Sequence, residues 1–169
     1  MSDKNANYLW KRRFNIKHRA LVNRMYYLER QRIFEFREGF IKAASIVAGS
    51  VALANVADQQ LLQLCAAFIT LASTASLVFG YGNKARESMK LSGEWTRLER
   101  DIDLAGERLF TEDQINQWQA RCCEIETEEP QAHSILLERC SERAKKALGG
   151  EPDSKLSFIH RHCPIIMIP

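Results

Sequence analysis

The sequence contains few residues that interrupt helices, with only 8 glycines and 4 prolines among 169 residues. Its hydrophobic share of 46% and its charged share of 27% exclude wholesale disorder and collagen-like repeats. The length fits one domain with a sizeable core and argues against a multi-domain enzyme. We therefore expect an all-α fold.

Motifs of enzyme chemistry are also missing. The glycines match neither the dinucleotide-binding fingerprint nor the phosphate-binding P-loop. Cys122-Cys123 and the His-Arg-His-Cys run at 160–163 carry zinc-ligand side chains, but they lack the spacing of structural zinc sites. The number of cysteines is odd and no signal-peptide pattern is present, which favours a reducing compartment over a disulfide framework. We expect no catalytic residues, no metal site and no cofactor.

Charge is distributed unevenly along the chain. The formal charge is +7 over residues 1–42, −1 over residues 43–83, −5 over residues 84–130 and +2 over residues 131–169. Asp58 is the single charged residue between 43 and 83. The acidic region after residue 83 is a natural electrostatic partner for the basic N-terminal region.

Residues 1–38 are predicted to form a basic amphipathic helix, from about Asn7 to Glu38. Its apolar stripe recurs at steps of roughly three and four residues and comprises Phe14, Leu21, Met25, Leu28 and Phe36. Only Gly39 interrupts the pattern before Lys42, so this helix is able to continue into the next segment.

Residues 39–83 are predicted to form a transmembrane hairpin. The first apolar segment, about residues 40–57, has 18 residues, or about 27 Å at helical rise. The second, about residues 61–82, has 22 residues, or about 33 Å, which is enough to cross a hydrocarbon core of roughly 30 Å. The connection Asp58-Gln59-Gln60 is so short that the two helices must be antiparallel neighbours.

Cations flank the predicted hairpin at its two outer ends and are absent from its loop. They are Arg37 and Lys42 before it, and Lys84, Arg86 and Lys90 after it. The positive-inside rule expects this distribution for a hairpin whose two ends both lie in the cytoplasm. The alternative is a soluble helical scaffold or adaptor that buries the apolar hairpin in the core of an oligomer.

Small residues recur at intervals of four in both apolar segments. They are Ala44, Ala48 and Ala52 in the first, and Ala72, Ser76 and Gly80 in the second. This spacing lets helix backbones approach closely, either within the hairpin or between subunits.

Polar side chains form a loose strip along the second apolar segment. They are Gln63, Thr70, Ser73 and Thr74. Polar groups in a bilayer tend to face protein or water, so these residues are pore-lining candidates if several hairpins assemble. The alternative is hydrogen bonding between helices or back to the carbonyls of the same helix.

Residues 84–148 are predicted to form a cytoplasmic helical region, a bundle or a coiled coil that drives homo-oligomerisation. Its first stripe comprises Ala85, Met89, Trp95, Leu98, Ile102, Ala105 and Leu109. Thr111 and Gln114 then form a capping-box pattern that starts a new helix, which must end near Pro130. The stripe of that helix comprises Ile115, Trp118, Cys122 and Ile125.

A last helix is predicted from about Gln131 to Leu148, where Gly149 and Gly150 stop it. Its stripe comprises Ile135, Leu136, Cys140, Ala144 and Leu148. Residues 149–169 show no clear period and are expected to form an irregular tail.

The basic first helix also allows a nucleic-acid-binding module that acts through Lys11, Arg12, Arg13 and Arg19. The aromatic residues of this helix, however, lie on the stripe that is expected to pack, where they cannot stack on bases. Attraction to anionic lipid headgroups explains the same charge. Nucleic acid is therefore the weakest of the partners that we consider.

The order of the parts adds a further clue: a basic helix with Lys17-His18-Arg19-Ala20, two apolar segments with a short loop, and a charged helix with Trp95. The segment from Thr111 to Ala120 follows, and Ile125-Glu126 precedes Pro130. Over about residues 8–148 this order resembles the SLATT family of two-transmembrane domains, which are associated with nucleotide-synthesising SMODS and sensor SLOG modules in bacterial conflict systems.

The resemblance implies a non-enzymatic effector of the bacterial inner (cytoplasmic) membrane. Such an effector oligomerises and forms a pore or disrupts the membrane, in antiphage defence or abortive infection. The expected partners are the lipid bilayer, further copies of the chain, and either a nucleotide second messenger or a signalling partner protein as the trigger. The family supplies no catalytic residues to carry over.

Overall fold

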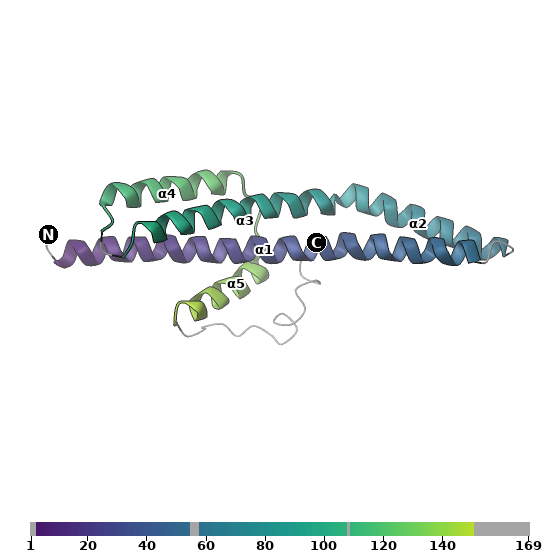
Figure 1. Cartoon of the computed structure of the whole chain (residues 1–169), viewed down its shortest axis with the longest axis horizontal. Helices are drawn as coiled ribbons and strands as arrows, with labels where there is room; N and C mark the ends of the chain where they lie inside the picture. Colours follow the sequence, from purple (N-terminus) through teal and green to yellow (C-terminus); the bar gives the residue numbers. More distant parts are fainter. Residues whose placement is uncertain (1–2, 55–57, 108, 151–169) are drawn as a thin grey trace. The chain divides into compact units, whose positions relative to one another are not determined.

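The computed structural model describes residues 3–54, 58–107 and 109–150 (Figure 1). Its helices are α1 (Asp3–Ala54), α2 (Gln59–Phe79), α3 (Tyr81–Leu104), α4 (Glu112–Thr127) and α5 (Ser134–Ala147). No strand occurs among these residues, so the predicted all-α class is confirmed. The chain divides into a first unit, residues 1–29 with 88–169, and a second unit, residues 30–87.

Helix α1 passes through Gly39 without a break, as the sequence allowed, and its described part ends at Ala54. Residues 55–57, the end of the first predicted apolar segment, lie outside the described residues. Asp58 then caps α2, because its carboxylate accepts hydrogen bonds from the backbone N–H groups of Gln60 and Leu61, both at 3.1 Å.

The second apolar helix ends earlier than predicted, at Phe79 rather than at residue 82. Gly80 has a φ of 58°, in the left-handed region, and its N–H donates a 3.1 Å hydrogen bond to the carbonyl of Ser76. Glycine takes this conformation without the steric cost that a Cβ brings, so it ends one helix and lets α3 start at Tyr81.

In the first unit, α1 packs against α3 and α4 through the opposite charges that the sequence indicated. Lys17 pairs with Asp103 of α3 at 2.5 Å, and Arg24 pairs with Glu99 of the same helix at 2.8 Å. The carboxylate of Glu126, on α4, pairs with Arg19. The electrostatic pairing of the basic helix with the acidic region is thus confirmed within this unit.

The predicted stripe of α1 was wrong, because only Leu21 of its five residues is buried, while Met25 is partly buried. Phe14, Leu28 and Phe36 are exposed. The buried positions of α1 in the first unit include Leu9, Arg13, Ile16, Ala20 and Tyr27, which recur at steps of three, four and seven. Because this seam includes a buried arginine and a small alanine, a search for large apolar residues does not detect it.

Arg13 is accommodated on the seam because its charged end has partners. A terminal nitrogen of its guanidinium donates a 3.2 Å hydrogen bond to the carbonyl of Ile102. Its Cζ also lies 5.5 Å from the centre of the Phe110 ring, within the range of a cation–π contact.

The stripe predicted for the α3 region was correct in part. Trp95, Leu98 and Ile102 are buried in the first unit, and Ala85 is buried in the second. Met89 and Leu109 are exposed, and Ala105 is only partly buried. Ser88, Leu91 and Ser92 are buried instead. The small side chain of Ser92 permits a close approach to α1, where its hydroxyl lies 3.5 Å from the carbonyl oxygen of Arg24.

Helix α4 matches its prediction in its cap, its stripe and its end. Thr111 and Gln114 form the capping box, with hydrogen bonds in both directions between them. All four residues of the predicted stripe, Ile115, Trp118, Cys122 and Ile125, are buried. The helix ends at Thr127, before Pro130.

Helix α5 starts at Ser134, three residues later than predicted. His133 has an extended backbone, with φ −80° and ψ 114°, and its N–H donates a 2.9 Å hydrogen bond to the hydroxyl of Tyr26 on α1. This tertiary contact keeps the chain out of the helical conformation until Ser134. Of the predicted stripe, Leu136, Cys140 and Ala144 are buried, Ile135 is partly buried and Leu148 is exposed.

Candidate functional site

The predicted pore-lining residues Gln63, Thr70, Ser73 and Thr74 are all exposed on α2 in the second unit. Gln63, Thr70 and Thr74 are seven and four residues apart, so they share one helix face. The hydroxyl of Thr70 donates a 2.8 Å hydrogen bond to the carbonyl of Ala66 in the same helix. Its donor is therefore satisfied within one copy, while its oxygen is still able to accept.

Both stripes of small residues lie on the seam between α1 and α2. Ala44, Ala48, Ala52, Ala72, Ser76 and Gly80 are partly buried. Beside the first stripe, a Cβ placed on Gly49 would lie 4.0 Å from Cδ1 of Ile69. Positions 61, 65, 69, 72, 75 and 76 are the partly buried ones of α2, and they centre on the face opposite to Gln63 and Thr70. Gln63, Thr70 and Thr74 therefore face away from α1, whereas Ser73 lies at the side of the helix.

Two of the predicted flanking cations lie over aromatic rings in the second unit. The guanidinium carbon of Arg37 is 5.8 Å from the ring centre of Tyr81, and Nζ of Lys84 is 5.7 Å from that of Phe34. The two rings stack with their centres 6.2 Å apart. These four side chains form one cluster that joins α1 to the start of α3.

Of the other three flanking cations, two make contacts within their own helix. Nζ of Lys42 pairs with Glu38 at 2.6 Å, and Nε of Arg86 donates a 3.4 Å hydrogen bond to the carbonyl of Gly82. Lys90 belongs to the first unit, where it pairs with Glu128.

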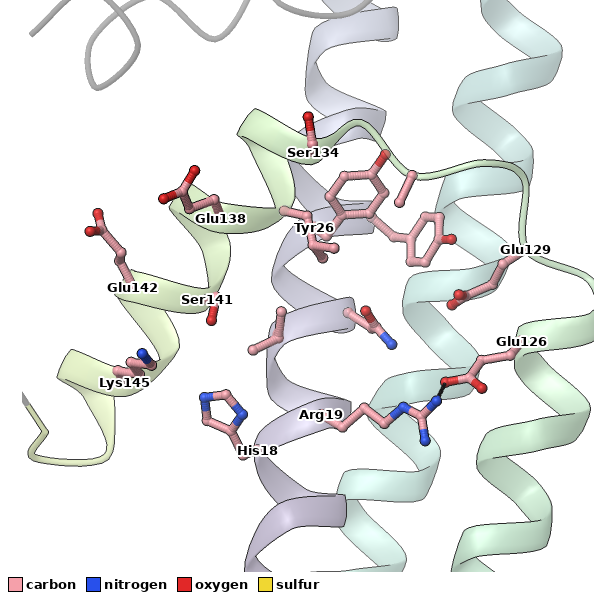
Figure 2. A pocket seen from close by; sticks show the side chains of 15 residues that line it. His18, Arg19, Tyr26, Glu126, Glu129, Ser134, Glu138, Ser141, Glu142 and Lys145 are labelled. Atoms are coloured by element: carbon pink, nitrogen blue, oxygen red, sulfur yellow. Dashed lines mark ion pairs between the residues drawn. The ribbon is translucent and has the colours of Figure 1, made fainter. Parts of the chain in front are cut away.

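The first unit contains a groove of about 900 Å³ that the sequence did not indicate, and we call it the α1–α5 groove (Figure 2). Its volume lies in the range of ligand pockets, roughly 300–1,000 Å³. Helix α1 contributes His18, Arg19, Val22, Asn23, Tyr26 and Tyr27. The end of α4 and the following loop contribute Glu126, Glu129 and Ala132, and α5 contributes Ser134, Leu137, Glu138, Ser141, Glu142 and Lys145.

Two contacts attach α5 to α1 and so define the walls of the groove. At the start of α5, the hydroxyl of Tyr26 accepts the hydrogen bond from His133. Further along the helix, Arg143 pairs with Glu29 of α1. Tyr26 and Glu29 lie one turn apart on α1, so the two contacts hold α5 at separate points along its length.

The α4 side of the groove carries two carboxylates in different states. Glu126 pairs with Arg19, as Figure 2 shows, and the charge of that arginine is thereby largely offset. Burial raises the pKa of Glu129 above its usual value, although hydrogen bonds from Trp95 and Tyr27 act in the opposite direction. The Trp95 indole N–H donates the stronger contact, at 2.6 Å.

At the other end of the groove, His18 lies near Lys145 (Figure 2). Burial lowers the pKa of His18 below its usual value of 6.5, and the positive charge of Lys145 lowers it further. The imidazole is therefore neutral at pH 7. Nε2 of His18 and Oε1 of Glu142 are both buried and have no hydrogen-bond partner among the described residues.

The charges of the lining favour a cationic ligand. Four glutamates line the groove, and the cationic side chains are Arg19, already paired with Glu126, and Lys145. With His18 neutral, the lining carries an excess of negative charge. A phosphate-rich ligand would meet these carboxylates, whereas an amine or a guanidinium would be attracted to them.

Metal-ligand clusters and thiols add no group to the groove in the described part of the chain. It contains no cluster of three or more His, Cys, Asp or Glu side chains suited to a metal ion. Burial raises the pKa of Cys122 and of Cys140 to about 11, so both thiols stay protonated. Residues 160–163, the second group that carries zinc-ligand side chains, lie outside the described residues.

Sequence reasoning missed the groove because its two main walls are 100 residues or more apart in the chain. In the sequence, the carboxylates at 126 and 129 have the pattern of a solvated acidic helix end, and His18 lies between the cations Lys17 and Arg19. One signal was available: Tyr26-Tyr27, two adjacent aromatic residues on a helix, cannot both lie on one apolar stripe, so one of them must serve a second contact. No family model, curated protein or solved structure matches this chain.

Proposed function

We propose that this chain is a non-enzymatic effector of the bacterial inner membrane that oligomerises and opens a pore. The observation that carries the proposal is the exposure of the apolar helices of the second unit. Helix α2 has 21 residues and none of them is buried. Its exposed large apolar residues are Leu62, Leu64, Phe68, Leu71, Leu77, Val78 and Phe79.

The apolar part of α1 in the same unit is exposed in the same way. Its exposed large side chains are Phe40, Ile46, Val47, Val51 and Leu53. Soluble monomers rarely expose apolar patches of more than a few hundred Å². These two helices therefore need lipid or other copies of the chain to cover them.

Length and composition support a lipid environment for α2. Within the described residues, the stretch Gln59–Leu104, which comprises α2 and α3, contains one window long and apolar enough to cross a membrane, and none of that window is buried. We propose that α2 spans the bilayer, and that residues 40–57 accompany it as a second span. Arg37 and Lys84 then lie at the cytoplasmic boundary, so both ends of the chain face the cytoplasm.

The polar strip of α2 supports the pore. Gln63, Thr70 and Thr74 face away from the seam with α1, where another copy or water would meet them. In lipid such side chains are stabilised when they face protein or water. Several copies that turn these faces inward would surround a polar channel. The resemblance to the SLATT family agrees with this arrangement and with a role in antiphage defence.

The α1–α5 groove is the proposed site at which a trigger acts on the first unit. A trigger shifts the equilibrium between closed and open assemblies only as far as its affinities for the two states differ. The resemblance suggests two triggers, a nucleotide second messenger or a partner protein. The acidic lining of the groove favours a cationic segment of a protein over a nucleotide.

Leakage of small dyes from bacterial cells that express the chain tests the pore. We expect expression to raise leakage, and the double variant Thr70→Leu/Ser73→Leu to reduce it, because leucines remove the polar lining. Ser50→Leu is the matched control: Ser50 is an exposed hydroxyl on α1 that bonds to the carbonyl of Ile46, but it lies outside the α2 strip. Normal assembly with unchanged leakage in the double variant would overturn the lining assignment, and the absence of leakage from the unaltered chain would overturn the pore.

The second candidate is a soluble scaffold or adaptor in which several copies bury the apolar helices against one another. It is favoured by the fact that, within the described residues, α2 qualifies as a membrane span and the apolar part of α1 does not. The two candidates place α2 in different surroundings, so a single arginine introduced on its exposed face discriminates between them, as set out in the Discussion.

A further inference from the structure

A second hollow connects the end of the described chain to the α1–α5 groove. It has a volume of about 280 Å³ and is lined by Phe14, Asn15, His18, Lys145, Leu148 and Gly150. His18 and Lys145 line both hollows, so the two are adjacent. A path therefore leads from Gly150, past the exposed Phe14 and Leu148, into the groove.

The residues that follow Gly150 have the chemistry that this path would accept. The sequence of 151–169 carries a cationic centre, His160-Arg161-His162, between apolar residues that include Phe158, Ile159, Ile165 and Ile166. The path offers apolar side chains first and then the carboxylates of the α1–α5 groove. The segment and the path therefore present apolar and charged groups in a matching order.

We propose that residues 151–169, which lie outside the described residues, bind in the α1–α5 groove of their own chain, with Arg161 paired to Glu142. Oε1 of Glu142 is buried without a partner among the described residues, and a guanidinium supplies the missing donor. Phe158 and Ile159 contact the apolar lining, which includes Val22 and Leu137. This inference goes beyond the proposed function, because it requires neither a membrane nor a pore.

The length of the segment permits this contact. Arg161 is eleven residues beyond Gly150, which corresponds to at most about 36 Å of extended chain. The distance along α5 from Lys145 back to Ser134 is about 16 Å at helical rise. Because the segment is tethered, its effective concentration near the groove is on the order of millimolar, so a weak intrinsic affinity is sufficient.

Disulfide formation in the full chain tests the proposal, because the segment contains Cys163. Cys65→Ala and Cys123→Ser remove the accessible thiols, while Cys122 and Cys140 stay buried and slow to react. In this background Ser141→Cys places a thiol in the groove. Gln117→Cys is the matched control, because Gln117 is exposed on α4 and does not line the groove.

Under mild oxidation, the intramolecular disulfide from residue 141 to Cys163 is expected to form about tenfold faster than that from residue 117, because docking raises the local concentration of the thiol. Equal rates would overturn the proposal. Disulfides that form between two chains would overturn the assignment to the chain's own segment and would indicate a second copy as the occupant.

Charge variants test the pairing of Arg161 with Glu142. In the Ser141→Cys protein, either Arg161→Glu or Glu142→Lys is expected to slow disulfide formation about tenfold, because one charge-assisted contact is lost. The double variant with both charges exchanged is expected to restore the rate. Glu124→Lys, an exposed carboxylate of α4 outside the groove, should leave the rate unchanged. Single variants with unchanged rates, or a double swap that fails to restore the rate while helix content is normal, would contradict this pairing.

Discussion

The indole Nε1–H of Trp95 donates a 2.6 Å hydrogen bond to the carboxylate of Glu129, and so joins α3 to the loop that leads from α4 to α5. Trp95 is completely buried, whereas Glu129 lines the α1–α5 groove. The contact therefore connects the helical core of the first unit to the edge of the groove. A buried carboxylate at this position makes the stability of the unit dependent on pH.

Replacement of Glu129 by glutamine is expected to flatten this pH dependence. The pKa of Glu129 is raised, so its contribution to the free energy of unfolding is fully present below its usual value of 4.5 and is lost as pH rises through the folded pKa. Glu129→Gln keeps an oxygen that accepts from Trp95 but cannot ionise. Urea unfolding in mild detergent between pH 4 and pH 8 measures this difference, because that range spans roughly the ionisation of Glu129. As pH rises, the variant should gain stability relative to the unaltered chain.

Glu128 provides the matched control on the neighbouring residue. A hydrogen bond from Lys90 lowers the pKa of Glu128, so its contribution is present above its usual value of 4.5 and is lost as pH falls. Glu128→Gln should therefore change the pH dependence in the opposite direction. A stability difference for Glu129→Gln that is the same at every pH would contradict this account of Glu129.

Alanine substitutions at two glycines are expected to have opposite effects. Gly80 has a φ of 58°, and a Cβ in this conformation costs about 1–2 kcal/mol, so Gly80→Ala should lower the unfolding midpoint. Gly39 lies inside α1, and a Cβ there would meet no atom within 4 Å. Gly39→Ala should therefore stabilise the chain by about 0.5–1 kcal/mol. Thermal unfolding in detergent measures both. A higher midpoint for Gly80→Ala would contradict the left-handed turn at Gly80, and a lower midpoint for Gly39→Ala would contradict the open surroundings of Gly39.

Ion pairs in the first unit are expected to contribute according to their burial. Arg24 and Glu99 have side chains that are 30% and 17% exposed, whereas those of Lys90 and Glu128 are 63% and 59% exposed. A double-mutant cycle to alanine should give a coupling energy of about 0.5–3 kcal/mol for the first pair. The second pair should give a smaller coupling energy, since solvent screens it. A coupling energy for the exposed pair that exceeds that of the partly buried pair would contradict the packing of α1 on α3.

Local sequence signals predicted the helices of the chain well where one helix carries the whole signal. The capping box of Thr111 and Gln114 and the stripe from Ile115 to Ile125 lie in one short segment and do not depend on distant residues. The continuity of α1 through Gly39 also followed from local propensity. The end of α2 was missed by three residues, because the φ of Gly80 is set by the turn into α3 and glycine adopts either sign of φ.

The charge pairing of α1 with α3 and α4 was predicted, but other features that depend on tertiary contacts could not be predicted from the sequence. The buried face of α1 includes Arg13, whose burial depends on distant partners: the carbonyl of Ile102 and the ring of Phe110. The extended conformation of His133 depends on Tyr26, more than 100 residues earlier in the chain. The α1–α5 groove depends on this same contact, so no local sequence motif indicates it.

An arginine on the exposed face of α2 separates lipid from water. Leu71 is 72% exposed on α2, and an arginine at the centre of a membrane span costs about 2.5–3.5 kcal/mol of insertion free energy. Leu71→Arg should therefore reduce the fraction of chain integrated into the membrane. Leu104→Arg is the control, because Leu104 is 76% exposed at the end of α3 in the first unit. An equal integrated fraction for both variants would show that Leu71 does not face lipid.

Fractionation of carbonate-washed membranes tests the central claim, that the exposed apolar helices of the second unit lie in a bilayer. Alkaline carbonate removes proteins bound to the membrane surface and leaves integrated helices in the pellet. The account predicts that the full chain stays in the pellet and is released only by detergent. Recovery of the chain in the soluble fraction without detergent, as a large oligomer, would contradict it and would favour the scaffold.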